Sequence, residues 1–303
     1  MRPADLGRSQ EAEAFAKLSK KSPCGCDGRS VEGGRASAVP VKRPGIVMPM
    51  STLRIEAIPC LRDNYAYLIS GSGGDAWIVD PSEPGPLVEA LAQRPGLALR
   101  GILATHHHCD HVGGIEALVA AAGDDPPWVA GHASDRGRIP RQSVFVDAPD
   151  DRFVASGIEL GGRPLLAMWI PGHTMGAIAW HLPARPDEDD TAGDVFTGDT
   201  LFAAGCGRLF EGTAAQMYTS LQNLTSLPPA TRLWFGHEYT AANLRFAATI
   251  EPESSAVRDR QAQLSVPSTP TSVALEVATN PFVRSSGGEE LAQRRAAKDV
   301  FRG

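Results

Sequence analysis

The chain concentrates ionisable side chains in one short stretch, Thr-His-His-His-Cys-Asp-His at residues 105–111. Side chains of this kind are costly to remove from water unless they gain a partner. A stretch so dense in them lies either on a solvated polar loop or around one or two metal ions. The fold must therefore either expose this segment to water or supply further ligands around it.

The spacing within the stretch directs its side chains to two points. Residues two apart in an extended segment face the same side, so His106 and His108 face one point and His107 faces away. The chain then turns at a glycine pair, so that Asp110 and His111 can face a neighbouring point. Imidazole and carboxylate together suit Zn²⁺, Fe or Mn. The pattern therefore favours metal binding over a solvated loop.

Three further candidate ligands lie far along the chain, and two metal ions would need them. His173 stands in "PGHTMG", Asp199 in "TGDTLF" and His237 in "FGHEYT". Each follows an expected strand next to a glycine, which allows close approach of the backbone, and ligand sites gather at strand ends. Asp199 has two carboxylate oxygens and can bridge two ions. His132 and His181 have no such context, and we expect ordinary surface or loop residues.

The five cysteines are scattered, and no secretory signal is evident. We therefore expect a cytoplasmic protein without a disulfide framework. Cys109 points away from the neighbouring candidate ligands, so we do not expect it to bind metal. The glycines beside Cys206 indicate packing in a tight turn rather than a nucleophile. Cys24 and Cys26 are interpreted as exposed thiols rather than a metal or redox pair.

Apolar periodicity divides most of the chain into strands and helices. Strands are expected at 53–59, 64–70, 76–82, 99–108, 164–173, 177–183, 194–202 and 231–239. Helices are expected at 85–94, 114–123, 240–250, 254–264 and 288–301. The first three strands follow one another closely and predict a β-meander.

Three regions of the chain differ in composition and in apolar periodicity. Residues 1–50 are rich in Gly, Pro, Arg, Lys and Ser, which predicts a disordered extension. Acidic residues in it count against a transit peptide, and translation from Met48 or Met50 is an alternative. Residues 51–237 alternate strands with helices and predict a catalytic domain, whereas helical spacing dominates 238–303 and predicts a smaller domain.

Charge and hydropathy exclude some partners. The net charge of −6 disfavours nucleic acid, because phosphate binding requires a basic face. No run approaches the roughly 18 apolar residues of a membrane-spanning helix. We therefore expect a small-molecule partner, no membrane insertion, and a monomer.

At these residues the chain resembles the metallo-β-lactamase superfamily, in which Thr-His-x-His-x-Asp-His is followed by single His, Asp and His residues. It is more closely similar to the hydroxyacylglutathione hydrolases, also called glyoxalase II. The stretches that carry this likeness extend over residues 51–303: "DNYAYLI" (63–69), "THHHCDHVGG" (105–114), "PGHTMG" (171–176), "FTGDTLFAAGCGRLFEGT" (196–213), "GHEYT" (236–240), "NPFVR" (280–284) and "RRAAKD" (294–299). The first motif indicates only the superfamily, whereas the "GDTLF" run and the C-terminal basic pair point to the family.

The resemblance implies an α+β fold, an αββα sandwich of two mixed sheets with helices outside, followed by a smaller helical C-terminal domain. It also implies two divalent metal ions per chain, with Zn favoured and Fe or Mn accepted. One ion would be held by His106, His108, His173 and Asp199, and the other by Asp110, His111, Asp199 and His237.

The implied activity is hydrolysis of S-(2-hydroxyacyl)glutathione, typically S-D-lactoylglutathione, to glutathione and D-lactate in methylglyoxal detoxification. Asp110 and Asp199 would act as catalytic residues through the metal pair. A hydroxide bridging the ions, its pKa lowered toward about 7, would attack the thioester carbonyl. An alkyl thiolate with a parent pKa of about 8.5 leaves without a strong general acid.

Glutathione carries two carboxylates, so an acidic chain must supply local positive charge. Spacing alone places Arg295 and Lys298 on one helix face and favours their complementing the end of that helix. The resemblance instead implies that this pair holds the glycine carboxylate. It implies that Tyr239 donates its hydroxyl to the same ligand and that Arg208 occupies a basic position. Phe210 stands where some relatives have Tyr.

Four alternatives follow from the same residues. A glutathione persulfide dioxygenase would use a single iron and would not need the Asp110, His111 and His237 group. A lactonase or β-lactamase leaves the C-terminal basic pair unexplained, and a nuclease would need a basic surface. A metal-binding protein that has lost catalysis usually lacks a ligand, and none is missing here.

Overall fold

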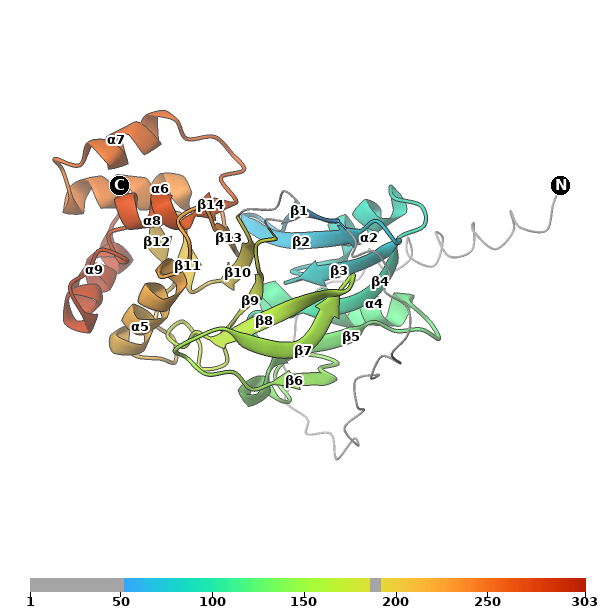
Figure 1. The fold of residues 1–303 in the computed structure, drawn as a ribbon. Coiled ribbons are helices and arrows are strands. Elements are labelled where there is room, and N and C mark those ends of the chain that lie inside the picture. Colours follow the sequence, from blue (N-terminus) through green and yellow to red (C-terminus); the bar gives the residue numbers. More distant parts are fainter. Residues whose placement is uncertain (1–51, 186–191) are drawn as a thin grey trace.

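The computed structural model describes residues 52–185 and 192–303 (Figure 1). The expected disordered extension at 1–50 and most of the polar loop at 184–194 lie outside the described residues. Two six-stranded sheets face each other in Figure 1, and helices cover their outer surfaces.

The first sheet begins with the expected meander. Its order is β1 (Leu53–Cys60), β2 (Asn64–Gly71), β3 (Asp75–Val79), β4 (Ala98–Leu103), β5 (Trp128–His132) and β6 (Val144–Val146). The first three strands are antiparallel, and the neighbours from β3 to β6 are parallel. Parallel neighbours require crossovers, which α2 (Pro84–Ala92) and α4 (Ile115–Ala121) provide.

The second sheet is mainly antiparallel. Its order is β14 (Thr271–Ser272), β13 (Arg232–Phe235), β10 (Asp194–Gly198), β9 (Ile178–Leu182), β8 (Arg163–Trp169) and β7 (Val154–Leu160). Only β10 and β13 are parallel, and α5 (Ala214–Thr225) lies between them in the chain. A hairpin of β11 (Leu201–Phe202) and β12 (Gly205–Cys206) follows β10.

The helices after β13 lie at one end of the sandwich (Figure 1). They are α6 (Thr240–Ile250), α7 (Ser255–Ala262), α8 (Val273–Thr279) and α9 (Gly288–Val300). Helix α9 packs against α5, which joins this region to the second sheet. The other short helices in the described part of the chain are α3 (Cys109–Val112) and the 3₁₀ turn η1 (Ala133–Asp135).

Alternating burial explains the layers. In β2, Tyr65, Tyr67 and Ile69 face the core between the two sheets, whereas Ala66 and Leu68 face the core beneath the helices. A strand buried on both faces reads as a continuous apolar run, as "YAYLI" does. Among the described residues, a third cluster fills the space between the second sheet and α5, α8 and α9. The predicted αββα sandwich with a helical C-terminal part is therefore confirmed.

The expectation for His132 and His181 as surface or loop residues is wrong. His132 ends β5 and His181 lies in β9, and both are buried. The His132 ring stacks at 5.9 Å on Trp169, and His181 packs at 4.8 Å against the edge of Phe153. Isolated histidines carry no periodic signal of their own, so burial by neighbouring strands is visible only in three dimensions.

Several strands are shorter than the sequence predicted. The segments expected at 99–108 and 164–173 leave the sheet after Leu103 and Trp169. The candidate ligands after them therefore lie on loops rather than on strands. None of the helices in the two described ranges is both long and apolar enough to cross a membrane.

Replacement of Phe196 by alanine tests the core between the sheets. The side chain is fully buried there, with ring centroids 5.5 Å from Tyr67 and 6.3 Å from Trp234. We expect the free energy of unfolding, measured by urea denaturation, to fall by about 3–5 kcal/mol, because burial is lost and a cavity remains. The control Leu275→Ala on α8, where the residue is exposed, should change it by less than about 0.5 kcal/mol. Equal losses in both variants would contradict the assigned core.

Candidate metal centre

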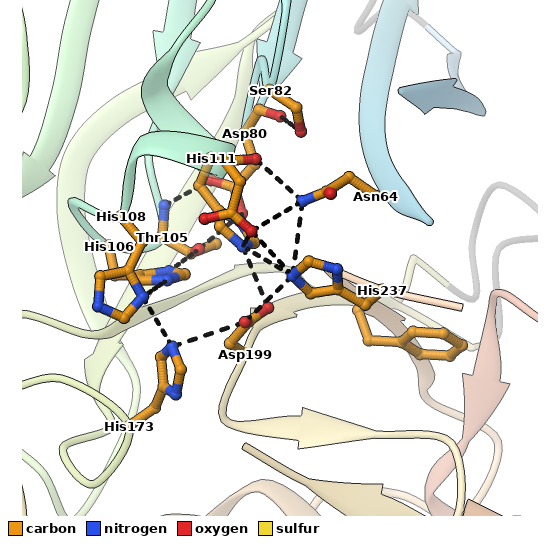
Figure 2. Close-up of polar contacts among 12 residues, drawn as sticks. Asn64, Asp80, Ser82, Thr105, His106, His108, His111, His173, Asp199 and His237 are labelled. Carbon is orange, nitrogen blue, oxygen red and sulfur yellow. Dashed lines mark hydrogen bonds and ion pairs between the residues drawn. The ribbon is translucent and has the colours of Figure 1, made fainter. Parts of the chain in front are cut away.

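The seven candidate ligands converge at one edge of the sandwich, and Figure 2 labels all of them except Asp110. They come from the segments that follow four strands, β4 in the first sheet and β8, β10 and β13 in the second. They are His106, His108, Asp110, His111, His173, Asp199 and His237. The structure therefore brings together residues that the sequence separates by up to 131 positions (237 minus 106).

Three histidines form a first group. His106 Nε2 lies 3.2 Å from His108 Nδ1, and His173 Nε2 lies 3.0 Å from the same His108 atom. His106 and His173 are buried, whereas His108 is partly exposed. Although residues 105–108 are not in a strand, His106 and His108 share one side as the sequence predicted.

A second group contains Asp110, His111 and His237. His237 Nε2 lies 3.3 Å from Asp110 Oδ2 and 3.4 Å from His111 Nε2. Asp110 Oδ2 lies 3.8 Å from His111 Nε2. Helix α3 carries the first two residues of this group, so the turn after His108 redirects them to a separate point.

The Asp199 carboxylate lies between the two groups (Figure 2). Its Oδ1 is 3.2 Å from His111 Nε2, and its Oδ2 is 3.5 Å from His173 Nε2 and 3.3 Å from His237 Nε2. A side chain at Gly236 would place its Cβ 2.3 Å from Asp199 Oδ1, so glycine is required there. One carboxylate therefore contacts histidines of both groups.

Asp80 fixes the orientation of two rings. Its Oδ2 accepts hydrogen bonds from Thr105 Oγ1 at 2.6 Å and from His111 Nδ1 at 3.0 Å. Because the Thr105 hydroxyl donates to Asp80, it accepts from His106 Nδ1 at 3.1 Å. This network assigns the protons of both rings to Nδ1 and leaves the Nε2 lone pairs directed into the cluster.

Two further rings are held in the same way. His173 Nδ1 donates to the Arg208 carbonyl at 2.9 Å, and His237 Nδ1 donates to Asp63 Oδ1 at 2.9 Å. Their Nε2 lone pairs therefore also point inward. Four inward Nε2 atoms and the two carboxylates form a donor set that favours a cation.

The electrostatics differ between the two groups. Burial lowers the pKa of His106 well below its usual range, and burial with neighbouring His173 lowers the pKa of His108 to about 4. Both rings are therefore neutral, as metal ligands must be. Burial also opposes charge on His237, but the Asp199 carboxylate outweighs it and raises the pKa to about 10. A cation bound there would displace a proton.

The donor set fits metal ions. Asp199 Oδ1 is buried without a hydrogen-bond partner, and such an atom is costly unless a cation neutralises it. The donor atoms within each group lie within 4.8 Å of one another. Asp80 also lies near His106 and His111, but its oxygens already accept hydrogen bonds from the Thr105 amide and hydroxyl and from the His111 ring. We therefore do not assign Asp80 as a ligand.

Two exposed aromatic residues flank the cluster at opposite ends. The Phe210 ring, 61% exposed, makes edge contacts with His108 at 5.4 Å and His173 at 5.3 Å. The Tyr239 ring, 39% exposed, stacks on His237 at 4.8 Å. Each group thus has one aromatic wall open to solvent.

The three basic candidates gather beside α9. Arg208 Nε and Arg295 Nη2 lie 3.5 Å and 3.0 Å from the same Asp299 oxygen. Arg295 is buried and also donates to the Cys206 carbonyl, whereas the Arg208 side chain is 65% exposed. Lys298 is half-buried and donates to a carbonyl of α6. Arg208 and Arg295 therefore share one acidic side chain, Asp299, whereas Lys298 is held by the backbone of α6.

The positions of Cys206 and His107 agree with the sequence analysis. Cys109 is exposed, and Cys206 is buried in the core under α5. His107 points away from the cluster toward Asp135. Cys24 and Cys26 lie outside the described residues.

Sequence reasoning missed the residues that orient the ligands. Asp63 and Asn64 stand in the quoted "DNYAYLI" stretch without an assigned role, yet Asn64 Nδ2 donates to Asp110 Oδ2 at 3.2 Å. Asp80 ends β3 in the same way that candidate ligands end other strands. The recurrence of acidic residues at strand ends was the available signal.

Two family models together match almost all of the described chain. The model of the metallo-β-lactamase superfamily matches residues 61–237, and the model of the hydroxyacylglutathione hydrolase C-terminus matches residues 238–302. Similar curated proteins named hydroxyacylglutathione hydrolase occur in Cereibacter sphaeroides and Synechococcus sp., each 43% identical. The matches cover 82% of this chain and 99% and 100% of those proteins, respectively.

Solved structures show the same fold. ETHE1 from Myxococcus xanthus superposes with a TM-score of 0.57 at 25% identity and covers 83% of this chain and 92% of its own. The BLEG-1 B3 metallo-β-lactamase superposes with a TM-score of 0.53 at 21% identity and covers 77% of this chain and 100% of its own. At 21% identity, the similarity to BLEG-1 concerns the fold alone.

Replacement of Asp199 by alanine tests the shared carboxylate. Both metal positions lose a carboxylate oxygen. Loss of an outer hydrogen-bond partner typically lowers metal affinity by about 10- to 100-fold, and we expect a larger loss here. Metal content of the purified variant, measured by elemental analysis, should drop. The control Asp75→Ala breaks a surface ion pair with Arg100 and should retain metal. Full metal content in the Asp199 variant would contradict its placement between two ions.

Proposed function

The chain belongs to the hydroxyacylglutathione hydrolase family of the metallo-β-lactamase superfamily, and we propose that it hydrolyses S-D-lactoylglutathione to glutathione and D-lactate. It is a thioester hydrolase of this family. The observation that carries the proposal is the Asp199 carboxylate between two complete groups of ligand-type side chains.

We propose two divalent ions per chain, Zn²⁺ first and Fe or Mn as alternatives. The first would be held by His106, His108 and His173, and the second by Asp110, His111 and His237. Asp199, which contacts histidines of both groups, would be shared by the two ions. When bound, such a pair supplies Lewis acidity, which polarises the thioester carbonyl and lowers the pKa of a water molecule toward about 7. The four inward Nε2 atoms support this assignment, as does Asp199 Oδ1, which is buried and accepts no hydrogen bond.

The chain's own side chains would orient and enclose the thioester. Asp110 and Asp199 are the proposed catalytic residues, and Asn64 holds the Asp110 carboxylate in place. Phe210 and Tyr239 would cover the two ends of the centre and exclude water from the acyl group. Burial raises the pKa of Tyr239, so its hydroxyl stays protonated and can donate a hydrogen bond to substrate. The leaving thiolate needs no strong acid.

The basic residues would bind the carboxylates of glutathione. Arg208 is the most exposed of the three, and Lys298 is partly accessible. Arg295 is engaged with Asp299 and Cys206, so a substrate carboxylate would compete with Asp299 for the shared positive charge. Phe210 offers no hydroxyl, so the aromatic wall would contribute contact area without a hydrogen bond.

The alternative of a single-iron glutathione persulfide dioxygenase is not favoured. Curated relatives that match about four-fifths of the chain carry the hydrolase name, and the C-terminal family model matches as well. The group Asp110, His111 and His237, which that alternative would not need, is complete. A protein that had lost catalysis would also be expected to lack a ligand.

We further propose a monomer in a reducing compartment such as the cytoplasm, with the domain boundary between residues 237 and 238. Cys60, Cys109 and Cys206, the cysteines in the described part of the chain, are free thiols, which supports the compartment. The boundary is supported by the change from strands to helices after β13 and by the end of one family model there.

The activity assay uses S-D-lactoylglutathione and follows loss of thioester absorbance. We expect turnover that stops when a chelator removes the metal and returns when Zn²⁺ is added back. Elemental analysis of the active protein should give close to two ions per chain. Full metal loading without hydrolysis of any glutathione thioester would contradict the proposed function.

The affinity for glutathione thioesters should weaken at alkaline pH. Burial, with the nearby charges of Arg295 and Arg245, lowers the pKa of Lys298 from 10.5 to about 8. The ammonium is therefore present below pH 8 and is lost above it, so KM should rise as the pH passes about 8. Steady-state kinetics measured from about pH 6 to about pH 10 bracket the Lys298 pKa of about 8 and test this effect.

Two controls separate this effect from changes at the metals. In Lys298→Gln the KM should already be high and should not show the same rise near pH 8. A thioester of a neutral thiol, which has no carboxylate to bind, should show no such rise with the wild type. An identical alkaline rise of KM in the variant would rule out Lys298 as its source.

A further inference from the structure

His107 is the histidine of the motif that faces away from the metal ligands, and it lies in a second polar cluster. This outer cluster consists of His107, Asp135, Arg138 and Glu211. Its members come from the loop after β4, from η1 and the turn that follows it, and from the loop before α5. The proposed mechanism uses none of them.

Asp135 anchors His107 from inside the protein. Its carboxylate is fully buried and accepts from His107 Nδ1 at 3.2 Å. A side chain at Gly176 would place its Cβ 2.1 Å from this carboxylate, so the glycine after the His173 loop allows the close approach. His107 is therefore fixed between His106 and His108 by a buried acid.

Arg138 connects this anchor to a second loop. Its guanidinium donates both to His107 Nε2 and to a carboxylate oxygen of Glu211. Arg138 Nη1 also lies 3.5 Å from Asp135 Oδ1. With Nδ1–H directed to Asp135, the Nε2 of His107 carries the lone pair that a guanidinium requires. One arginine thus joins three side chains from separate segments.

Glu211 in turn holds the loop that carries His173. Its Oε2 accepts from the Met175 amide at 2.8 Å. The amides of Phe210 and Glu211 donate to the His173 carbonyl at 3.2 Å and 3.4 Å. The outer cluster therefore extends without a break from the loop of His106 and His108 to the loop of His173.

We propose that Arg138 and Glu211 are positioning residues for the first metal position, because they fix the two loops whose histidines form it. This inference rests on the proposed metal centre. The first group needs His108 and His173, on different loops, to keep donor atoms 3.0 Å apart. Outer partners of metal ligands typically change metal affinity by about 10- to 100-fold.

The second metal position has a different support. His111 and His237 are oriented by Asp80 and Asp63, and Asn64 holds Asp110. None of these contacts involves the outer cluster. Disruption of the cluster should therefore weaken binding of one ion and leave the other nearly unchanged.

The fold itself should depend little on Arg138. Its side chain is 42% exposed, and exposed ion pairs contribute little to stability. A loss of metal affinity without a loss of stability in the metal-free protein would distinguish positioning from a general structural role. Lysine at this position keeps the charge but has a single nitrogen. It cannot reach His107 and Glu211 with one nitrogen and Asp135 with another, as the guanidinium does.

The experiment compares Arg138→Gln, Arg138→Lys and Glu211→Gln with the wild type. The last keeps an acceptor for the Met175 amide but loses the charge pair. Arg141→Gln is the matched control, since Arg141 belongs to the same segment and pairs with exposed Glu116 at 2.8 Å. Each metal-free protein is titrated with Zn²⁺ against a competing chelator. Anomalous diffraction from zinc-loaded crystals then shows which position is emptied.

We expect about 10- to 100-fold weaker binding at the first position in Arg138→Gln and Glu211→Gln, and a smaller loss in Arg138→Lys. Binding at the second position, and the thermal midpoint of the metal-free proteins, should match the Arg141 control. Unchanged affinity at both positions in the variants would overturn the inference alone. Zinc affinity that falls equally at both positions, together with a lower thermal midpoint, would also overturn the inference. A wild type that binds no zinc would contradict the metal centre itself and this inference with it.

Discussion

A buried carboxylate shared by two groups of histidines is the constraint on which the site depends. Asp199 lies out of reach of bulk water, where an isolated negative charge is strongly disfavoured. His111 and His237 stand on one side of it and His173 on the other, so positive charge can approach both of its oxygens. The same burial that makes the carboxylate costly makes it a strong attractor for cations. The other candidate ligands surround this carboxylate.

Both sheets of the sandwich contribute ligands around this carboxylate, because the segments that carry them meet at the ends of the two sheets. The loop after β4 belongs to the first sheet, and the loops after β8, β10 and β13 belong to the second. Backbone bonds connect the sheets at the site itself, since the Tyr65 amide donates to the Gly236 carbonyl at 2.8 Å and the Glu238 amide to the Asp63 carbonyl at 2.8 Å. The apolar core between the sheets sets their separation, and the hydrogen bonds at the edge set the register of the ligands.

A layer of polar side chains behind the ligands gives each ring one orientation. Asp80 and Asp63 fix the protons of His111 and His237 on Nδ1, and the outer cluster around Arg138 fixes the two loops that carry the first group. A histidine left free to rotate would lose much of its value as a ligand, because its lone pair must point at one place. The centre therefore combines sequence-distant ligands with supports that are equally distant in sequence.

The sequence by itself determined the meander, the C-terminal helices α6, α7 and α9, and the identity of the seven candidate ligands, since local periodicity and motif density do not depend on distant contacts. It did not predict α8. The helix over 240–250 and the first two strands needed almost no correction. Only the tertiary structure decided that His132 and His181 are buried, that Asp80 accepts hydrogen bonds from Thr105 and His111, and that Arg295 points into the protein. Those properties arise from neighbours on other strands and helices. A single residue carries no local signal of which distant surface will cover it, so they emerge only when the sheets and helices pack together.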